Sequence, residues 1–237
     1  MKQVSLTAKQ MVLTAELVAR CERPVPVPGP EPGALYLSDD DCLAAAKNFA
    51  AQKDDGPFWI FAYGSLIWNP GFNYVEHLRG TAHGWHRQFS MQLTNWRGTP
   101  EQPGLMLALE HGGSCDGILF RLPEEKVVDE LLTLLLREVD RPDDLNYIRW
   151  VTVRTNGIKR RALVFWAHPK GFHMPEPPTM ELAAQMLARA CGHMGSCASY
   201  LYNTVAKLSE YDIYDRNLWH LQELVAKEIM GMGKDIG

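Results

Sequence analysis

Glu138 is an acidic residue placed where the sequence pattern predicts the apolar face of a helix. The helix is expected from Pro123 or Glu124 to about Val139. Three leucines lie seven, four and three residues before Glu138: Leu131, Leu134 and Leu135. Burial and the negative end of the helix dipole both raise the pKa of a carboxylate, which makes it a usable general base. The alternative is that the last turn frays, or that Glu138 forms an ordinary ion pair with Arg137 or Arg141.

A second candidate is the loop Tyr63-Gly64-Ser65-Leu66, which directly follows the apolar run FWIFAY. A chain that turns sharply at the end of a buried strand can point successive N–H groups at an anion, and glycine permits such a turn. The alternative is a plain turn from strand to loop, with Tyr63 packed in the core. The loop therefore indicates an anion or oxyanion site without requiring one.

Other chemistries find less support in the residues. The chain contains no G-x-G-x-x-G, G-x-x-x-x-G-K-[ST], H-E-x-x-H or G-x-S-x-G motif, which argues against nucleotide-binding and zinc-peptidase activities. Ser65 or Cys115 can still form a nucleophilic pair with a histidine in three dimensions. His83 and His86 suggest a metal, but their segment resembles a strand, and a spacing of three places their side chains on opposite faces. We expect no metal site.

The elements that must position Glu138 and the loop begin with strands. FWIFAY predicts a buried strand, and further strands are expected at residues 83–94, 105–110 and 117–122. The glycine-rich HGGSC segment between the last two is typical of a hairpin loop. Strands at 147–154 and 160–168 flank Asn156-Gly157, a strong hairpin signal. Strands come first and helices cluster at the end, which favours an α+β fold with a mixed, largely antiparallel barrel flanked by helices.

Helices make up the rest of the expected architecture. One is expected from the capping segment 38–41 to about Gln52, and three more at 179–190, at 196–208 and from about Asp215. A short helix over residues 7–20 precedes the proline-rich stretch PVPVPGPEPG, which can form only extended or turn structure. We therefore divide the chain into an N-terminal extension with a tether, residues 1–37, and a domain of residues 38–237.

The composition limits the kind of partner. The 237 residues are 46% hydrophobic with a net charge of -4, and charges of both signs are mixed, unlike the basic surface of a nucleic-acid binder. The sequence shows neither an apolar run of membrane-helix length nor a signal-peptide layout at its start. The five cysteines are scattered, without a C-x-x-C pair. We expect a cytoplasmic protein that acts on a small molecule, without nucleic acid or membrane as a partner.

Several ordered segments together resemble the ChaC family of glutathione-specific γ-glutamylcyclotransferases. They are WIFAYGSLIWNPGF (59–72), GWHRQFSMQLT (84–94), RGTPEQPGLMLALEHGGSCDGILFRLP (97–123), Arg137-Glu138 and GHMGSCASYLYNTV (192–205). They span about the last three quarters of the chain in the family's order. The resemblance implies a small mixed barrel flanked by helices, and an enzyme that converts glutathione into 5-oxoproline and cysteinylglycine.

The resemblance also implies roles for particular residues. Glu138 would be the proton acceptor, and the loop that binds the γ-glutamyl group would consist of Tyr63, Gly64, Ser65, Leu66 and Ile67. Trp68 and Arg97 lie in matching segments and are taken as structural. Because the substrate's own α-amine attacks its γ-carbonyl, the reaction needs neither an enzyme nucleophile nor a cofactor.

Three other functions remain open from the sequence. The same fold can act on γ-glutamyl amino acids or γ-glutamylamines, or it can serve as a non-catalytic binding protein, although a pure binder needs no base. A cysteine- or serine-dependent hydrolase would be inactivated by thiol or serine reagents.

Overall fold

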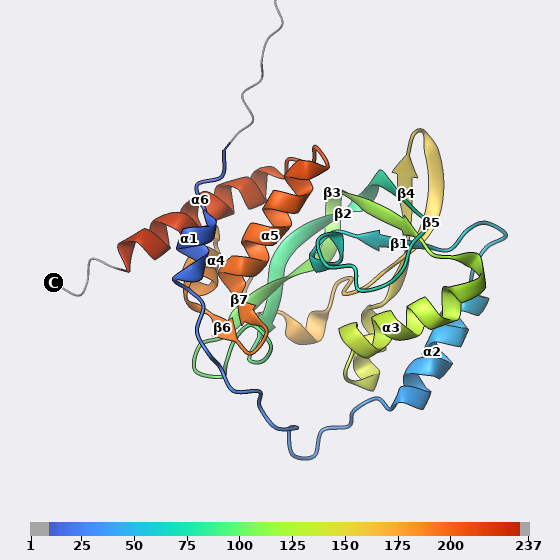
Figure 1. The fold of residues 1–237 in the computed structure, drawn as a ribbon, viewed down its shortest axis with the longest axis horizontal. Helices are drawn as coiled ribbons and strands as arrows, with labels where there is room; N and C mark the ends of the chain where they lie inside the picture. The colour runs from blue at the N-terminus through green and yellow to red at the C-terminus, as the bar shows by residue number, and fades with distance from the viewer. Residues whose placement is uncertain (1–9, 233–237) are drawn as a thin grey trace, which may run out of the picture.

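Five strands close into a barrel in the computed structural model, which describes residues 10–232 (Figure 1). They are β1 (Trp59–Ala62), β2 (Glu76–Leu93), β3 (Gly104–Arg121), β4 (Arg149–Thr155) and β5 (Ile158–Val164). Their order is β1-β3-β2-β4-β5, and a parallel contact between β1 and β5 closes the barrel, while the other pairs are antiparallel. The mixed, largely antiparallel barrel predicted from the sequence is confirmed.

The long hairpin of β2 and β3 corrects the predicted strand boundaries. HGGSC is part of β3 rather than a hairpin loop, and the separate strands expected at 105–110 and 117–122 are one continuous strand. The register shifts between His83 and Trp85, so that the pairing passes over Gly84. Gly84 (φ 82°) and Gly112 (φ 100°) adopt conformations that favour glycine. The glycine-rich pattern therefore marks a bulge, which continues the strand with a local kink.

Six α-helices accompany the barrel within residues 10–232. They are α1 (Ala15–Ala19), α2 (Asp39–Ala51), α3 (Val127–Glu138), α4 (Met180–Arg189), α5 (Cys197–Glu210) and α6 (Arg216–Gly231). Short 3₁₀ helices lie at Ser65–Ile67, Glu124–Lys126, Pro142–Tyr147 and Lys170–Phe172, and the two-residue strands β6 (Cys191–Gly192) and β7 (Gly195–Ser196) pair with each other. The expected helix starts are confirmed by side-chain N-caps at Ser38, Thr179, Ser196 and Asp215.

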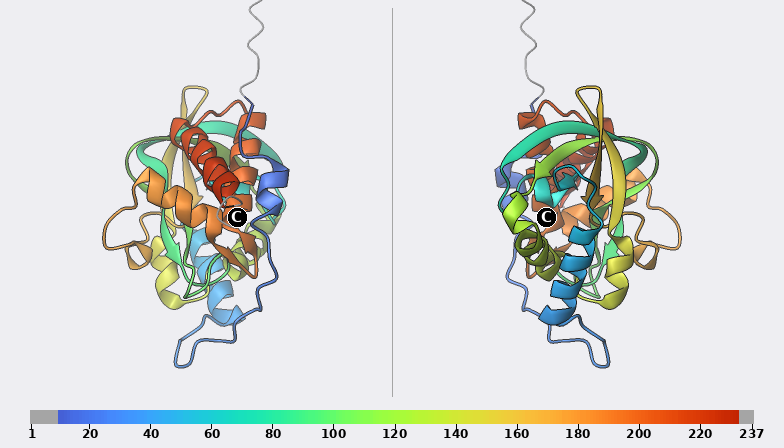
Figure 2. Two further views of the ribbon diagram at one scale, coloured as in Figure 1. Left: turned by 90° about the vertical axis from the view of Figure 1, so that its left-hand side faces the viewer. Right: turned by 90° about the vertical axis from the view of Figure 1, so that its right-hand side faces the viewer.

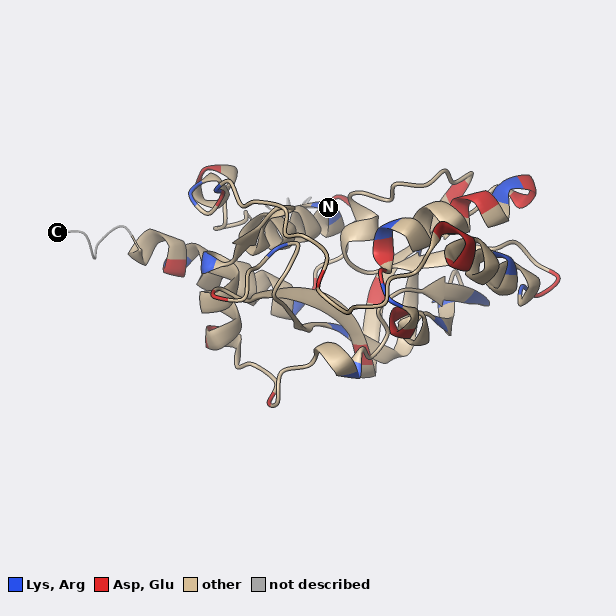
Figure 3. Ribbon diagram, turned by 90° about the horizontal axis from the view of Figure 1, so that it is seen from below, with Lys and Arg blue, Asp and Glu red and all other residues tan. Residues whose placement is uncertain are grey.

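The helices form two groups at opposite ends of the barrel (Figures 1 and 2). One group is α4, α5 and α6 with α1 against them, and the other is the pair α2 and α3. Acidic residues are frequent at the end formed by α2 and α3 (Figure 3). Glu138 is the last residue of α3. No helix among residues 10–232 is long and apolar enough to cross a bilayer.

The N-terminal segment is anchored on α6. The backbone N–H groups of Val12 and Leu13 donate to Gln222 Oε1 at 3.0 and 2.8 Å, and Leu13 is fully buried. Helix α1 is shorter than the predicted 7–20, and residues 7–9 of that prediction lie outside the described range. The proline-rich stretch 24–33 contains no helix or strand. The division of the chain at residue 38 stays a prediction.

Candidate active site

Glu138 is the last residue of α3, and its side chain is only 13% exposed. The leucines that predicted an apolar face are all buried: Leu131, Leu134 and Leu135. The last turn is closed by a hydrogen bond from the Val139 N–H to the Leu135 carbonyl at 3.0 Å, so it does not fray. The helix therefore buries its leucine stripe against the barrel and directs Glu138 inward at its end.

The carboxylate of Glu138 has few partners for a buried charge. Arg137 Nε lies 3.0 Å from Glu138 Oε1, and the side chain of Trp166 supplies a hydrogen bond. Burial raises the pKa of Glu138 despite the opposing effects of Arg137 and Trp166. The same guanidinium donates to the Asn69 and Pro70 carbonyls at 2.6 and 2.8 Å. Glu138 is thus both inward-facing and ion-paired, the two arrangements that the sequence presented as alternatives.

Tyr63 ties the first strand to the chain after β5. It is 7% exposed, and its hydroxyl lies 3.1 Å from the carbonyl oxygens of both Phe165 and Trp166, to which it can donate. Burial raises the pKa of Tyr63 well above its usual value, so the group stays a neutral phenol. Tyr63 is packed in the core, as expected for a structural turn, and it also fixes the position of the Trp166 backbone beside Glu138.

Gly64 and Ser65 make room for Tyr200 of α5. A Cβ at Gly64 would lie 2.8 Å from the Tyr200 hydroxyl oxygen, closer than side-chain atoms normally approach. Burial raises the pKa of Tyr200 to about 12, against the opposing effects of Arg97 and of the backbone and side chain of Ser65. Tyr200 therefore stays protonated at neutral pH, and its O–H can act as a donor. The glycine is required here by a close approach, and the tyrosine brings a donor to the loop.

These residues meet at a cavity of about 180 Å³. Glu138 lines it together with four of the five predicted loop residues: Tyr63, Gly64, Ser65 and Leu66. Ile67 does not line the cavity, because its side chain is 2% exposed and belongs to the hydrophobic core. Strands β2 and β3 and the chain after β5 supply much of the apolar wall, including Met91, Leu93, Met106, Leu107 and Phe165.

Sequence reasoning gave no site role to Trp68, Arg97, Trp166 and Tyr200, which also line this cavity. Trp68 and Arg97 were taken as structural, and both do make structural contacts. Trp68 Nε1 donates to Thr204 Oγ1 at 3.0 Å, and Arg97 Nη1 donates to the Ser196 carbonyl at 2.9 Å. Tyr200 lies inside the quoted segment 192–205, which was its only signal. Trp166 has a positive φ of 58°, a conformation that is uncommon for a bulky residue and that the sequence does not predict.

Three acids, Asp140, Asp144 and Glu130, also shape this region. Asp144, 5% exposed, lines the cavity and accepts the N–H groups of Asp140 and Arg141 at 3.0 and 2.9 Å. Burial and the nearby Asp144 raise the pKa of Asp140, which also lines the cavity. Glu130 is buried rather than solvated, because its carboxylate accepts the N–H and side-chain amide of Asn73 at 2.8 and 2.9 Å. It fastens the loop after β1 to α3.

The geometry argues against an enzyme nucleophile. None of the described residues that line the cavity is a histidine that could act as the base for Ser65. Cys115 is buried in the barrel, and burial raises the pKa of its thiol, which disfavours the reactive thiolate. Among the described residues, neither Ser65 nor Cys115 has the histidine partner that this chemistry needs.

In the part of the chain that it describes, the structure does not bring potential metal ligands together at His83 and His86, the histidines considered in the sequence analysis. His83 is exposed, and His86 bonds to the Gly112 carbonyl and the Gln88 side chain. Within residues 10–232, the side chains with metal-ligating atoms that gather together are Glu110, His168 and His173. None of these three residues lines the cavity.

The chain was compared with known proteins. The sequence model for the ChaC-like protein family matches residues 58–228, which include the loop, Glu138 and Tyr200. The glutathione-specific γ-glutamylcyclotransferase of Escherichia coli (strain K12) is 36% identical over 198 residues, 83% of this chain and 85% of that protein. γ-Glutamylcyclotransferase 2-3 of Arabidopsis thaliana is 32% identical, with 70% of this chain and 87% of that protein covered.

The fold has a solved counterpart. The crystal structure of a yeast γ-glutamyl cyclotransferase specific to glutathione aligns with a TM-score of 0.62 at 22% identity, covering 73% of this chain and 97% of that one. The aligned part corresponds to most of the chain and confirms the barrel fold. From the match over residues 58–228 and the identity to curated relatives across most of its length, the chain belongs to the ChaC-like protein family.

Proposed function

We propose that the protein is a γ-glutamylcyclotransferase that cleaves glutathione into 5-oxoproline and cysteinylglycine. The observation that carries this proposal is the Glu138 carboxylate, held in a cavity with a raised pKa and facing the Tyr63-to-Leu66 loop. The name of the Escherichia coli relative, which aligns over 85% of its length, supports glutathione as the substrate.

Glu138 acts as the base in the proposed mechanism. It accepts a proton from the α-ammonium of the γ-glutamyl group, and the resulting amine attacks the γ-carbonyl carbon of the same substrate. Intramolecular attack in a well-held geometry corresponds to effective molarities of about 10⁵ to 10⁸ M, so positioning supplies most of the acceleration. A raised pKa suits this task because Glu138 must take up a proton and then release it.

Collapse of the tetrahedral intermediate completes the reaction. The new C–N bond closes the five-membered lactam, and the bond from the carbonyl carbon to the cysteinylglycine nitrogen breaks. Glu138 returns its proton to that leaving nitrogen. The attacking nitrogen loses a second proton to solvent, and the released amine takes one up, so the overall proton count does not change.

The cavity carries groups of both signs, as a zwitterionic γ-glutamyl head requires. Glu138, Asp140 and Arg97 all line the cavity, so the two acids can attract the α-ammonium and Arg97 can bind the α-carboxylate. The O–H of Tyr200 and the loop around Ser65 are the donors placed to stabilise the oxyanion. In this proposal Ile67 contributes only through the fold of the loop, because its side chain is in the core.

We also propose a cytoplasmic location. All five cysteines are buried and unpaired. Thiols of this kind persist in a reducing compartment, which is also where a glutathione-degrading enzyme would find its substrate.

The decisive experiment is a product assay. Purified protein is incubated with glutathione in the presence of a metal chelator, and 5-oxoproline and cysteinylglycine are quantified beside a folded Glu138→Gln control. The proposal predicts equal amounts of both products from the wild type and a loss of turnover in the variant. γ-Glutamyl amino acids are run in parallel, because cleavage of these alone would replace glutathione with another γ-glutamyl substrate.

Inert glutathione and inert γ-glutamyl amino acids, with a folded wild type, would contradict the proposal and favour a binding protein on the same fold. Normal turnover by Glu138→Gln would keep the activity and reject the assigned base. Inactivation by a thiol or serine reagent that modifies the protein would favour the hydrolase alternative.

A further inference from the structure

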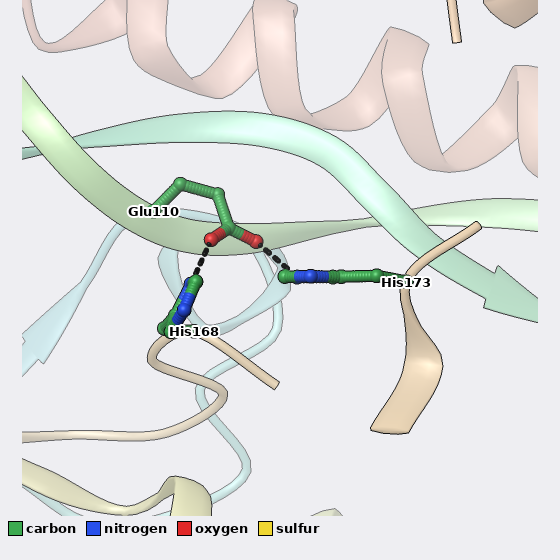
Figure 4. A group of neighbouring side chains, drawn as sticks. All are labelled: Glu110, His168 and His173. Atoms are coloured by element: carbon green, nitrogen blue, oxygen red, sulfur yellow. Dashed lines mark hydrogen bonds and ion pairs between the residues drawn. The ribbon is translucent and has the colours of Figure 1, made fainter. Parts of the chain in front are cut away.

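A second carboxylate, Glu110 of β3, lies outside the cavity and binds two histidines (Figure 4). Its oxygen Oε2 lies 2.6 Å from His168 Nδ1, and its oxygen Oε1 lies 2.7 Å from His173 Nε2. Ser90 Oγ donates to Oε1 at 2.6 Å from the neighbouring strand β2. The three potential ligand atoms of Glu110, His168 and His173 all lie within 4.8 Å of one another.

The histidines belong to the segment that follows β5 and crosses the outside of the barrel. His168 has a positive φ of 54°, and its backbone is fixed by a hydrogen bond from its N–H to the Leu109 carbonyl at 2.9 Å. His173 forms an isolated antiparallel bridge with Met91 of β2. Backbone contacts with β3 and β2 therefore hold both histidines next to Glu110.

We propose that Glu110, His168 and His173 form a binding site for a divalent transition-metal ion of the zinc type. Two imidazoles and one carboxylate are a ligand set that Zn²⁺ takes in proteins, with the remaining position left to water. Imidazole ligands favour zinc and neighbouring transition metals over Mg²⁺ and Ca²⁺, which prefer oxygen.

Burial and exposure are distributed as such a site needs. The Glu110 side chain is 9% exposed and is oriented by Ser90, which acts as a partner behind the ligand. The side chains of His168 and His173 are 25% and 27% exposed, so an ion can enter from solvent and keep water as a ligand. Hydrogen bonds with His168, Ser90 and His173 also fix the orientation of the Glu110 carboxylate.

Metal binding requires a small adjustment. Neighbouring ligand atoms around a tetrahedral Zn²⁺ are about 3.3 Å apart, given metal–ligand bonds of about 2.0 Å. The carboxylate oxygens are now 2.6 and 2.7 Å from the imidazole nitrogens, so each ring must move back by roughly 0.6 to 0.7 Å. Each neutral imidazole must also carry its proton on the other ring nitrogen, an exchange that the partly exposed rings can make with solvent.

The ion would crosslink strand β3 to the segment that contains Trp166, two residues before His168. Trp166 lines the cavity and hydrogen-bonds Glu138. The site is thus distinct from the proposed catalytic residues, and an occupied site would hold the cavity wall from outside. The proposed cyclisation does not pass through the metal.

The test is a metal titration of the full chain after treatment with chelator. Zn²⁺ binding is followed by calorimetry, and Co²⁺ binding by the visible absorption that reports coordination by nitrogen and oxygen ligands. We expect both ions to saturate at one equivalent and Zn²⁺ to raise the melting temperature. Two variants, Glu110→Gln and His173→Ala, should weaken the affinity at least about tenfold, whereas His220→Ala, an exposed histidine on α6, serves as the matched control.

Three results would overturn the proposal. They are a wild type that takes up no Zn²⁺ or Co²⁺, binding that both site variants retain, and a loss of binding in the His220→Ala control equal to theirs. Circular dichroism verifies that each variant is folded, and the conservative Glu110→Gln change keeps the shape of the side chain. Glutathione turnover in chelator is measured separately, so a failed metal titration leaves the cyclotransferase proposal intact.

Discussion

Glu138 and Glu110 are two largely buried carboxylates that differ in their hydrogen-bond donors. Glu138 has one guanidinium at 3.0 Å and one side-chain hydrogen bond from Trp166. Glu110 has three side-chain donors, Ser90, His168 and His173, at 2.6 to 2.7 Å. Burial acts to raise the pKa of both, but the resulting pKa of Glu138 is raised and that of Glu110 is lowered.

The contrast shows that donors, and not burial alone, decide what a buried carboxylate can do. A well-satisfied carboxylate keeps its charge, which suits it to hold a loop or a cation and makes it a poor proton carrier. A sparsely satisfied one takes up a proton readily, which suits it to general-base catalysis. The same residue type therefore has a structural task on β3 and a chemical one at the end of α3.

The largest expected difference between the two carboxylates is in turnover. Glu138→Gln should lower kcat by about 10² to 10⁴-fold, the usual contribution of a positioned base. Glu110→Gln should lower it by less than about tenfold, equivalent to about 1.4 kcal/mol in the activation barrier, because Glu110 acts only through the segment that carries Trp166. Steady-state assays with glutathione measure both, and an equal loss in the two variants would erase the distinction.

Stability should rank the two variants in the opposite order. Glu110→Gln removes charge-assisted hydrogen bonds, and we expect it to lower the free energy of unfolding by about 1.5 to 3 kcal/mol. Glu138→Gln removes a poorly compensated buried charge, so we expect no loss of stability at neutral pH. Urea unfolding monitored by tryptophan fluorescence gives both values. A Glu138→Gln protein less stable than Glu110→Gln would contradict this ranking.

The pH dependence of stability should differ in sign as well. The lowered pKa of Glu110 stabilises the fold above the pKa of the unfolded chain, and this contribution is lost as the pH falls through the folded value. The raised pKa of Glu138 stabilises the fold below the unfolded pKa, and this contribution is lost as the pH rises through the folded value. As the pH falls, the difference in the free energy of unfolding between wild type and Glu110→Gln should therefore become smaller. Over the same pH change, the wild type should gain stability relative to Glu138→Gln.

The fold was predictable where local patterns and tertiary structure agree. Short-range signals in the sequence were sufficient to predict several features of the barrel protein: strand β1, the hairpin at Asn156-Gly157, helix α3 and the N-cap at Thr179. The prediction was wrong at HGGSC because glycine marks a bulge as well as a loop. Only the register shift opposite HGGSC, where the pairing passes over Gly84 of β2, distinguishes the two, and strand pairing is a long-range property.

The candidate site was predictable only in part for a similar reason. Periodicity identified Glu138, since its leucine stripe lies within one helix. Tyr200 and Trp166 reach the cavity from elements far away in sequence, and the histidines around Glu110 are 58 and 63 residues from it. These side chains come together only because the barrel closes and because Trp166 and His168 have positive φ. Neither the closure nor the positive φ values can be read from a sequence pattern.

The smallest expected effect comes from removing one donor to Glu138. Trp166→Phe keeps an aromatic ring in the cavity wall but loses the indole N–H, which lowers the pKa of Glu138 in the wild type. Without it the pKa should rise further, and because only the deprotonated carboxylate is a base, the acid limb of the kcat/KM profile should move to higher pH. At pH values well above the limb, the rate should change little.

Trp150→Phe is the matched control for this measurement. It also removes an indole N–H, which donates to Gln52 Oε1 at 2.9 Å, but Trp150 does not line the cavity. Its pH profile should overlay that of the wild type. If Trp166→Phe also left the limb in place, the indole would not set the basicity of Glu138, and the contrast with Glu110 would rest on Arg137 and burial alone. A shift to lower pH would be inconsistent with Glu138 as the titrating base, since loss of a donor can only make its charged form harder to maintain.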